Sequence, residues 1–172
     1  YGAYSYDVEK SDPPTEKGKV TGSAKIGSFD EKSCVLEVHR QVALDTTQDD
    51  DASHTYSETS DVTVKIPLRD LDATKVTVDN LPSTFRKIYT ATGDTTKYLQ
   101  VTVNGKEGKS PIKVTEKRTM KDPAAEKKTE VVNLSDNAPT TYLMFSDADV
   151  ADRAQKALQH AVELCQKKKE AF

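Results

Sequence analysis

The stretch FSDADVADRAQKALQHAVELC, residues Phe145 to Cys165, carries the clearest pattern in the 172-residue chain and decides its C-terminal architecture. Its apolar side chains recur three or four positions apart, which places them on one stripe of an amphipathic helix. Ser146 is a suitable N-cap, and Asp149 follows three positions later, as in a capping box. We therefore predict one long helix over 146–170. Its apolar stripe consists of Val150, Ala151, Ala154, Ala157, Leu158, Ala161, Val162 and Cys165.

The chain before this helix alternates apolar and polar residues in several short segments, which predicts β-strands. Alternation of period two gives each strand one buried face and one solvent-facing face. We expect a mainly β, α+β fold in which antiparallel strands form a barrel or sandwich. A single sheet cannot bury its whole apolar face, so the helix is expected to cap an open end or edge. The clearest apolar sets are Leu36, Val38, Val42 and Leu44; Val62, Val64, Ile66 and Leu68; Val101 and Val103; Ile112 and Val114; Val132 and Leu134; and Leu143 and Phe145.

Residues 1–22 combine paired prolines, lysines and acidic residues without a sustained period. This composition predicts an irregular N-terminal extension, followed by a single domain over 23–172. The chain begins at Tyr1 without Met, so we expect its true N-terminus to be missing, as after removal of an export signal. An exported location, periplasmic or extracellular, and a cytoplasmic location both stay open.

The overall composition restricts the class of partner. Formal net charge is −3 and the pI is about 5.7, so the chain lacks the basic character of a nucleic-acid-binding domain. No apolar run approaches the roughly 20 residues of a membrane-spanning helix. Leu, Ile, Val and Phe make up about a fifth of the chain, which predicts a modest single core.

About eight strands followed by one capping helix resembles a pleckstrin-homology-like barrel and is similar to uncharacterised bacterial proteins of this architecture. The resemblance covers roughly residues 23–172 and rests on IPLRDLDATKVTV, residues 66–78, together with the terminal helix. A lipocalin-like barrel also ends in a helix, but its Gly-x-Trp motif is impossible in a chain without Trp. Members of the pleckstrin-homology family that bind phosphoinositides usually carry a basic cluster in the first hairpin. The corresponding segment here, DTTQDDDASH at 45–54, is acidic and repels phosphate, so the resemblance implies protein or peptide binding instead.

Arg40 is the most unusual residue of the strand pattern, because it falls on the apolar face of its segment. One interpretation is a β-bulge or a barrel-end position from which the guanidinium reaches water. The other is a cation that anchors a carboxylate or phosphate of a ligand. The sequence leaves both interpretations open.

Cys34 and Cys165 both fall on inward-facing positions. They are either two buried small apolar residues or a disulfide that joins the first main strand to the last helix. Sequence does not give their separation in space.

No catalytic, cofactor or metal motif is present. NGKEGKS, at 104–110, has only two residues between its glycines, and a predicted strand follows it, so it lacks the geometry of a phosphate-binding loop. Asn104-Gly105 instead predicts a hairpin turn. The aspartates at 49–51 lack calcium-ligand spacing, and the three histidines and two cysteines lack zinc-ligand spacing.

We therefore expect a non-catalytic module that binds a protein or peptide. A small-molecule or lipid carrier with its pocket at the barrel mouth is the main alternative, and an enzyme whose site assembles only in three dimensions is the third. An interaction module needs an open sheet edge or an exposed apolar patch, a carrier needs a roomy cavity, and an enzyme needs clustered titratable groups.

Overall fold

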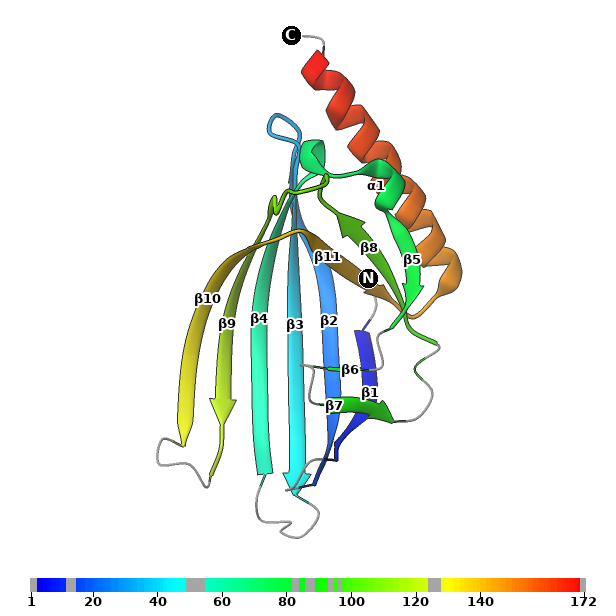
Figure 1. Ribbon diagram of the computed structural model, residues 1–172. Helices are drawn as coiled ribbons and strands as arrows, with labels where there is room; N and C mark the ends of the chain where they lie inside the picture. The colour runs from blue at the N-terminus through cyan, green and yellow to red at the C-terminus, as the bar shows by residue number, and fades with distance from the viewer. Residues whose placement is uncertain are drawn as a thin grey trace.

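The computed structural model describes residues 3–11, 15–48, 55–81, 84–85, 89–92, 95, 97–123 and 128–170. The fold is mainly β, with antiparallel strands and one long C-terminal helix, as the alternation predicted. The described strands form two sheets rather than a closed barrel (Figure 1).

The larger sheet has the order β10-β9-β4-β3-β2-β1-β7-β6, and every neighbouring pair is antiparallel. The smaller sheet has the order β11-β8-β5. The strands of the larger sheet are β1 (Ala3–Lys10), β2 (Glu16–Asp30), β3 (Val35–Gln48), β4 (Thr55–Pro67), β6 (Thr84–Phe85), β7 (Tyr89–Thr92), β9 (Ile112–Lys121) and β10 (Thr129–Ala138). Those of the smaller sheet are β5 (Thr77–Asn80), β8 (Leu99–Asn104) and β11 (Thr140–Phe145). Two short 3-10 turns, η1 (Leu68–Asp70) and η2 (Ala73–Lys75), lead from β4 into β5.

The prediction of an irregular extension over 1–22 is wrong for the described part of that segment. Residues 3–10 form β1, and residues 16–22 are the first half of β2. Tyr4 pairs with Gly22 and Val8 pairs with Gly18 across this hairpin. Few residues here are aliphatic, so the alternation that marks the other strands is weak. The segment is ordered by pairing instead, since β1 pairs with β2 and β7, and β2 pairs with β3.

One face of the larger sheet carries the core, and we call it the core face. It bears the even-numbered residues of β3, β4, β9 and β10, because directly paired residues of neighbouring strands share a face. The part of this face next to the β2–β3 turn packs against the smaller sheet and the helix in one apolar cluster. That cluster includes Leu36, Val38, Val64, Ile66, Ile112, Val101, Val103, Leu143 and Phe145.

The C-terminal helix α1 (Ala148–Glu170) lies against the smaller sheet and the η1–η2 segment (Figure 1). Asp147 caps its start, since its Oδ1 accepts a hydrogen bond from the backbone N–H of Val150 at 2.9 Å. The predicted cap at Ser146 is therefore one residue too early. Three glutamine amides fasten the helix to backbone carbonyls: Gln155 and Gln159 donate to Val76, and Gln166 donates to Leu71.

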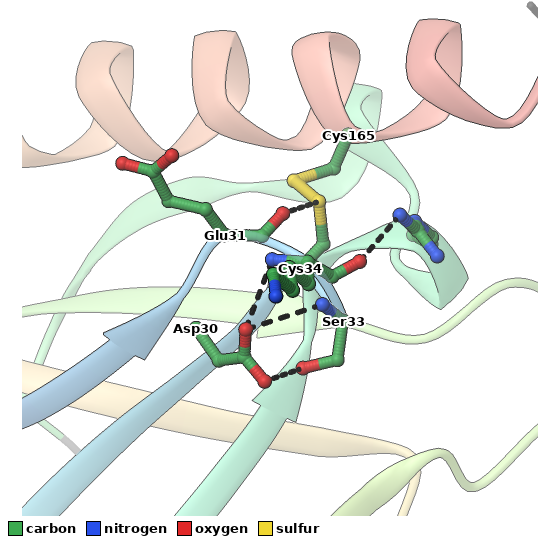
Figure 2. The surroundings of a disulfide bond; sticks show 7 residues. Asp30, Glu31, Ser33, Cys34 and Cys165 are labelled. Atoms are coloured by element: carbon green, nitrogen blue, oxygen red, sulfur yellow. Dashed lines mark hydrogen bonds between the residues drawn. A yellow bond between two sulfur atoms is a disulfide. The ribbon is translucent and has the colours of Figure 1, made fainter.

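A disulfide joins Cys34, in the turn between β2 and β3, to Cys165 of α1 (Figure 2). The two Cα atoms are 5.9 Å apart, and both residues are buried. Cys34 has a φ of 56°, in the left-handed region that residues other than glycine rarely adopt. Asp30 holds this turn, because its carboxylate accepts bonds from the backbone N–H groups of Lys32 and Ser33 and from the Ser33 hydroxyl. These bonds lower the pKa of Asp30, the Ser33 hydroxyl having the largest effect.

The hairpin predicted at Asn104-Gly105 is also wrong. β8 pairs with β5 and β11, whereas β9 pairs with β4 and β10, so the two strands that flank this dipeptide lie in different sheets. The amide of Asn104 donates to the Lys75 carbonyl, and the N–H of Gly105 donates to the Pro139 carbonyl. Among the described glycines, the positive φ of this connection belongs to Gly108.

Candidate functional site

A group of charged side chains interrupts the apolar character of the core face on β4 and β9. Arg118 Nε lies 3.0 Å from Glu116 Oε1 and 3.5 Å from Glu58 Oε1. Ser60 donates its hydroxyl to Glu116 at 2.7 Å, and Tyr56 donates its hydroxyl to Glu58 at 3.1 Å. The hydrogen bond to Glu116 raises the pKa of the Arg118 guanidinium above its ordinary value. The Arg118 cation thus bridges two carboxylates that the sheet partly removes from water.

Aromatic side chains line the part of the same face that β1 and β2 provide. Val8, Val20 and Leu44 form a second, smaller buried cluster, and Tyr4 and Tyr6 pack on it. The two tyrosine rings stack with centroids 6.1 Å apart. Burial raises the pKa of Tyr6 to about 12, and the phenol of Tyr142 adds to this shift.

Arg40 lies in the middle of the core face, between Ala24 of β2 and Val62 of β4. The register runs through it without a bulge; the irregularity of β2 lies between Ile26 and Ser28 instead. Its guanidinium carbon is 5.0 Å from the ring centre of Tyr142, and Nη1 donates to the Tyr142 carbonyl at 3.3 Å. Its Nε is buried without a hydrogen-bond partner in the described part of the chain.

A cavity of about 330 Å³ lies beside Arg40, between the core face and β11. Tyr142 and Met144 of β11 form one wall, and the strands of the larger sheet form the other. Glu116 also lines this cavity, but its carboxylate is bound by Arg118 and Ser60. The remaining walls are mainly apolar, through Val42, Val62 and Val114.

The outer strand β10 is a second feature with functional potential. Within the described residues it has a hydrogen-bonded neighbour, β9, on one side only, and Figure 1 shows it at the free left edge of the sheet. Val131 is 50% exposed and Leu134 is 43% exposed. Leu134 was predicted to be buried, and its position on an outer strand leaves it in solvent instead.

The acidic segment and the histidines considered in the sequence form no further site among the described residues. The acidic segment 45–54 is described only as far as Gln48, so its aspartates at 49–51 lie outside the described residues. His39 pairs with Glu37 at 3.0 Å on the opposite face of the sheet, and His160 is exposed on α1. Over the described residues, no three His, Cys, Asp or Glu side chains gather as a metal site requires. The helix of the structure is not long and apolar enough to cross a membrane in its described part.

Sequence reasoning missed the charged group on β4 and β9, although the signal was present. Glu116 and Arg118 follow Ile112 and Val114 at alternate positions, so they fall on the apolar face as Arg40 does. No such signal in the sequence marks the open edge of β10, because the residues of one strand do not determine the order of strands in the sheet.

Comparisons with known proteins give no match: no protein-family model, no curated protein and no solved structure is significantly similar to this chain. The pleckstrin-homology-like resemblance therefore stays a prediction.

Proposed function

We propose that this protein is a non-catalytic interaction module that binds an extended segment of a partner protein as an added strand along β10. The observation that carries the proposal is the open edge of β10, which has one sheet neighbour among the described strands. The unpaired N–H and C=O groups of an outer strand are a template for another chain.

β10 lacks several of the features with which proteins protect such edges. Its register with β9 is continuous from Thr129 to Ala138, so no bulge twists it away. The strand TEVVNLSDNA contains neither Lys nor Pro, and both Val131 and Leu134 are exposed. A regular strand of ten residues with exposed apolar side chains favours pairing with a further strand.

The charges of β10 indicate the chemistry of the partner segment. Glu130, Val132, Leu134 and Asp136 follow one another on the core face, giving the order acidic, apolar, apolar, acidic. Opposite charges paired directly across two strands stabilise the pair. We therefore expect the partner segment to carry basic, apolar, apolar and basic side chains at alternate positions.

The same charges oppose pairing of β10 with a second copy of itself. In an antiparallel pair centred on Asn133, Glu130 of each copy lies directly opposite Asp136 of the other. Like charges in directly opposed positions destabilise a strand pair. A heterologous partner with basic residues avoids this repulsion.

A charge-swap experiment tests the proposal. Fluorescence anisotropy measures binding of two labelled peptides with the cores Lys-Thr-Val-Thr-Val-Thr-Lys and Glu-Thr-Val-Thr-Val-Thr-Glu. We expect the parent protein to prefer the basic peptide by roughly threefold to thirtyfold, since two charged pairs change sign. The double variant Glu130→Lys, Asp136→Lys should prefer the acidic peptide.

Glu163→Lys, at an exposed position of α1, is the matched control and should keep the parent preference. Equal affinity of the parent for the two peptides contradicts the proposal. So does a change of preference in the control as large as that in the double variant. Sedimentation of the parent alone adds a further test, because a dimer that the double variant abolishes would assign the edge to a second copy.

A further inference from the structure

The cavity beside Arg40 carries a second inference, which is independent of the β10 edge. Strand residues around Arg40 are small or aliphatic: Ala24 and Val62 are its direct neighbours in the sheet. Their short side chains leave space over the guanidinium, and this space is the cavity of about 330 Å³ that β11 covers. Ligand-binding cavities in proteins range from about 300 to 1,000 Å³, so a small organic molecule fits.

The guanidinium of Arg40 has unused capacity for binding. An arginine has five N–H donors, and the structure gives Arg40 one hydrogen bond, a 3.3 Å contact from Nη1 to a backbone carbonyl. Its buried Nε has no partner among the described residues. Buried polar groups usually have a hydrogen-bond partner, so this N–H is available to a molecule bound in the cavity.

The charge of Arg40 is also not neutralised by an ion pair within the described residues. The carboxylate that lines the cavity, that of Glu116, is bound by Arg118 at 3.0 Å. Arg40 instead contacts the ring of Tyr142, which leaves its planar N–H fork without an anion. A carboxylate matches that fork with two parallel hydrogen bonds.

The other residues that line the cavity indicate the polarity and the charge of the rest of the ligand. Val42, Val62, Val114 and Met144 present hydrocarbon or thioether surface, which favours an apolar body. Glu116 carries a negative charge at the same cavity, so a ligand with one negative charge meets less repulsion than a doubly charged phosphate.

We infer that the cavity between β11 and the core face binds a small monocarboxylate, with its carboxylate on Arg40 and its apolar body against Val42, Val62 and Met144. Tyr142 holds the guanidinium in place through its ring and its carbonyl. Ser60 lies in the same cavity and adds a hydroxyl group to its polar side.

Titration calorimetry with octanoate and octanol tests this inference on the folded parent chain. The two probes share an apolar chain and differ in the charged head group. We expect saturable binding of octanoate, and binding of octanol that is about tenfold weaker or more, because a charge-assisted pair with arginine is lost. Equal affinities for octanoate and octanol, or no saturable binding of octanoate at millimolar concentration, overturn the inference.

Two variants then assign the site. Arg40→Gln should lose about tenfold or more in octanoate affinity and should no longer prefer octanoate to octanol, whereas Arg40→Lys should fall between this variant and the parent. Arg153→Gln, at an exposed position of α1, is the matched control and should bind as the parent does. Unchanged octanoate affinity in Arg40→Gln rejects the site. The comparison of probes on the parent stands even if Arg40→Gln fails to fold.

Discussion

Cys34 and Cys165 are joined by a disulfide that spans 131 positions of the chain and ties the β2–β3 turn to α1 (Figure 2). The bond closes most of the chain into one loop. Loops of this length restrict the unfolded chain strongly, and the chain-entropy treatment assigns them a stabilisation of about 4 to 5 kcal/mol before any strain is subtracted. The disulfide therefore fixes the helix against the sheet independently of side-chain packing.

Breaking this bond should lower the free energy of unfolding by about 3 to 5 kcal/mol. Cys165→Ala removes the bridge and leaves the left-handed backbone at Cys34 untouched. Urea denaturation followed by circular dichroism measures the loss. The parent in strong reductant is the control and should approach the variant. Equal midpoints for the oxidised parent, the reduced parent and the variant would show that the bond is absent in solution.

Asp30 gives the β2–β3 turn a dependence on pH. Hydrogen bonds from Ser33 and Lys32 lower its pKa, so the bonds stabilise the fold above its usual pKa of about 3.9 and are lost as the pH falls through the lowered value. Asp30→Asn should therefore melt at a lower temperature than the parent at pH 7. The gap should close below about pH 4.

Glu31→Gln is the control for this titration, because Figure 2 shows the Glu31 carboxylate pointing away from the turn. Its melting temperature should follow that of the parent across the same range. A gap between Asp30→Asn and the parent that stays constant down to pH 2 would mean that the carboxylate charge of Asp30 does not hold the turn.

Arg118→Met should destabilise the fold by about 2 to 4 kcal/mol, because it removes the guanidinium that bridges the partly buried carboxylates of Glu58 and Glu116. Lys117→Met, on the exposed face of the same strand, should change the free energy of unfolding by less than about 0.5 kcal/mol. Chemical denaturation of the two variants gives both values. Similar small losses for the two would show that the charged group contributes little.

Gln155 and Gln159 share one acceptor, the carbonyl of Val76, so their contributions should not add. Met has a similar helix propensity and no donor, which makes Gln→Met the suitable change. Each single variant should lose about 0.5 kcal/mol or less, since the other amide still satisfies the carbonyl. The double variant should lose about 1 to 2 kcal/mol. A double loss equal to the sum of the two single losses contradicts this sharing.

The alternation of apolar and polar residues predicted the buried residues of those strands that have one clearly apolar face and one clearly polar face. Val64, Ile66, Val101 and Val103 are buried as expected, because period two places them together on the covered side of a sheet. The stripe of α1 was predicted for the same reason at helical spacing, and Leu158 lies buried within it.

Local preference failed where distant parts of the chain decide the structure. Asn104 and Gly105 favour a tight turn, but hydrogen bonds to Lys75 and Pro139 hold them between two sheets. β1 has few aliphatic residues, and its pairing with β2 makes it a strand. The sequence predicted that Arg40 lies on an apolar face, but the cavity beside it depends on β11, which comes a hundred residues later.

The central claim, that β10 binds an extended segment as an added strand, is tested most directly by residue-resolved amide hydrogen exchange. In the free protein, amides of β10 that point toward β9 should exchange slowly, and the alternate amides at the open edge should exchange fast. Saturation with the basic peptide should slow the exchange of those alternate amides between Thr129 and Ala138, while the others change little. Unchanged exchange along β10 at peptide saturation would contradict the account.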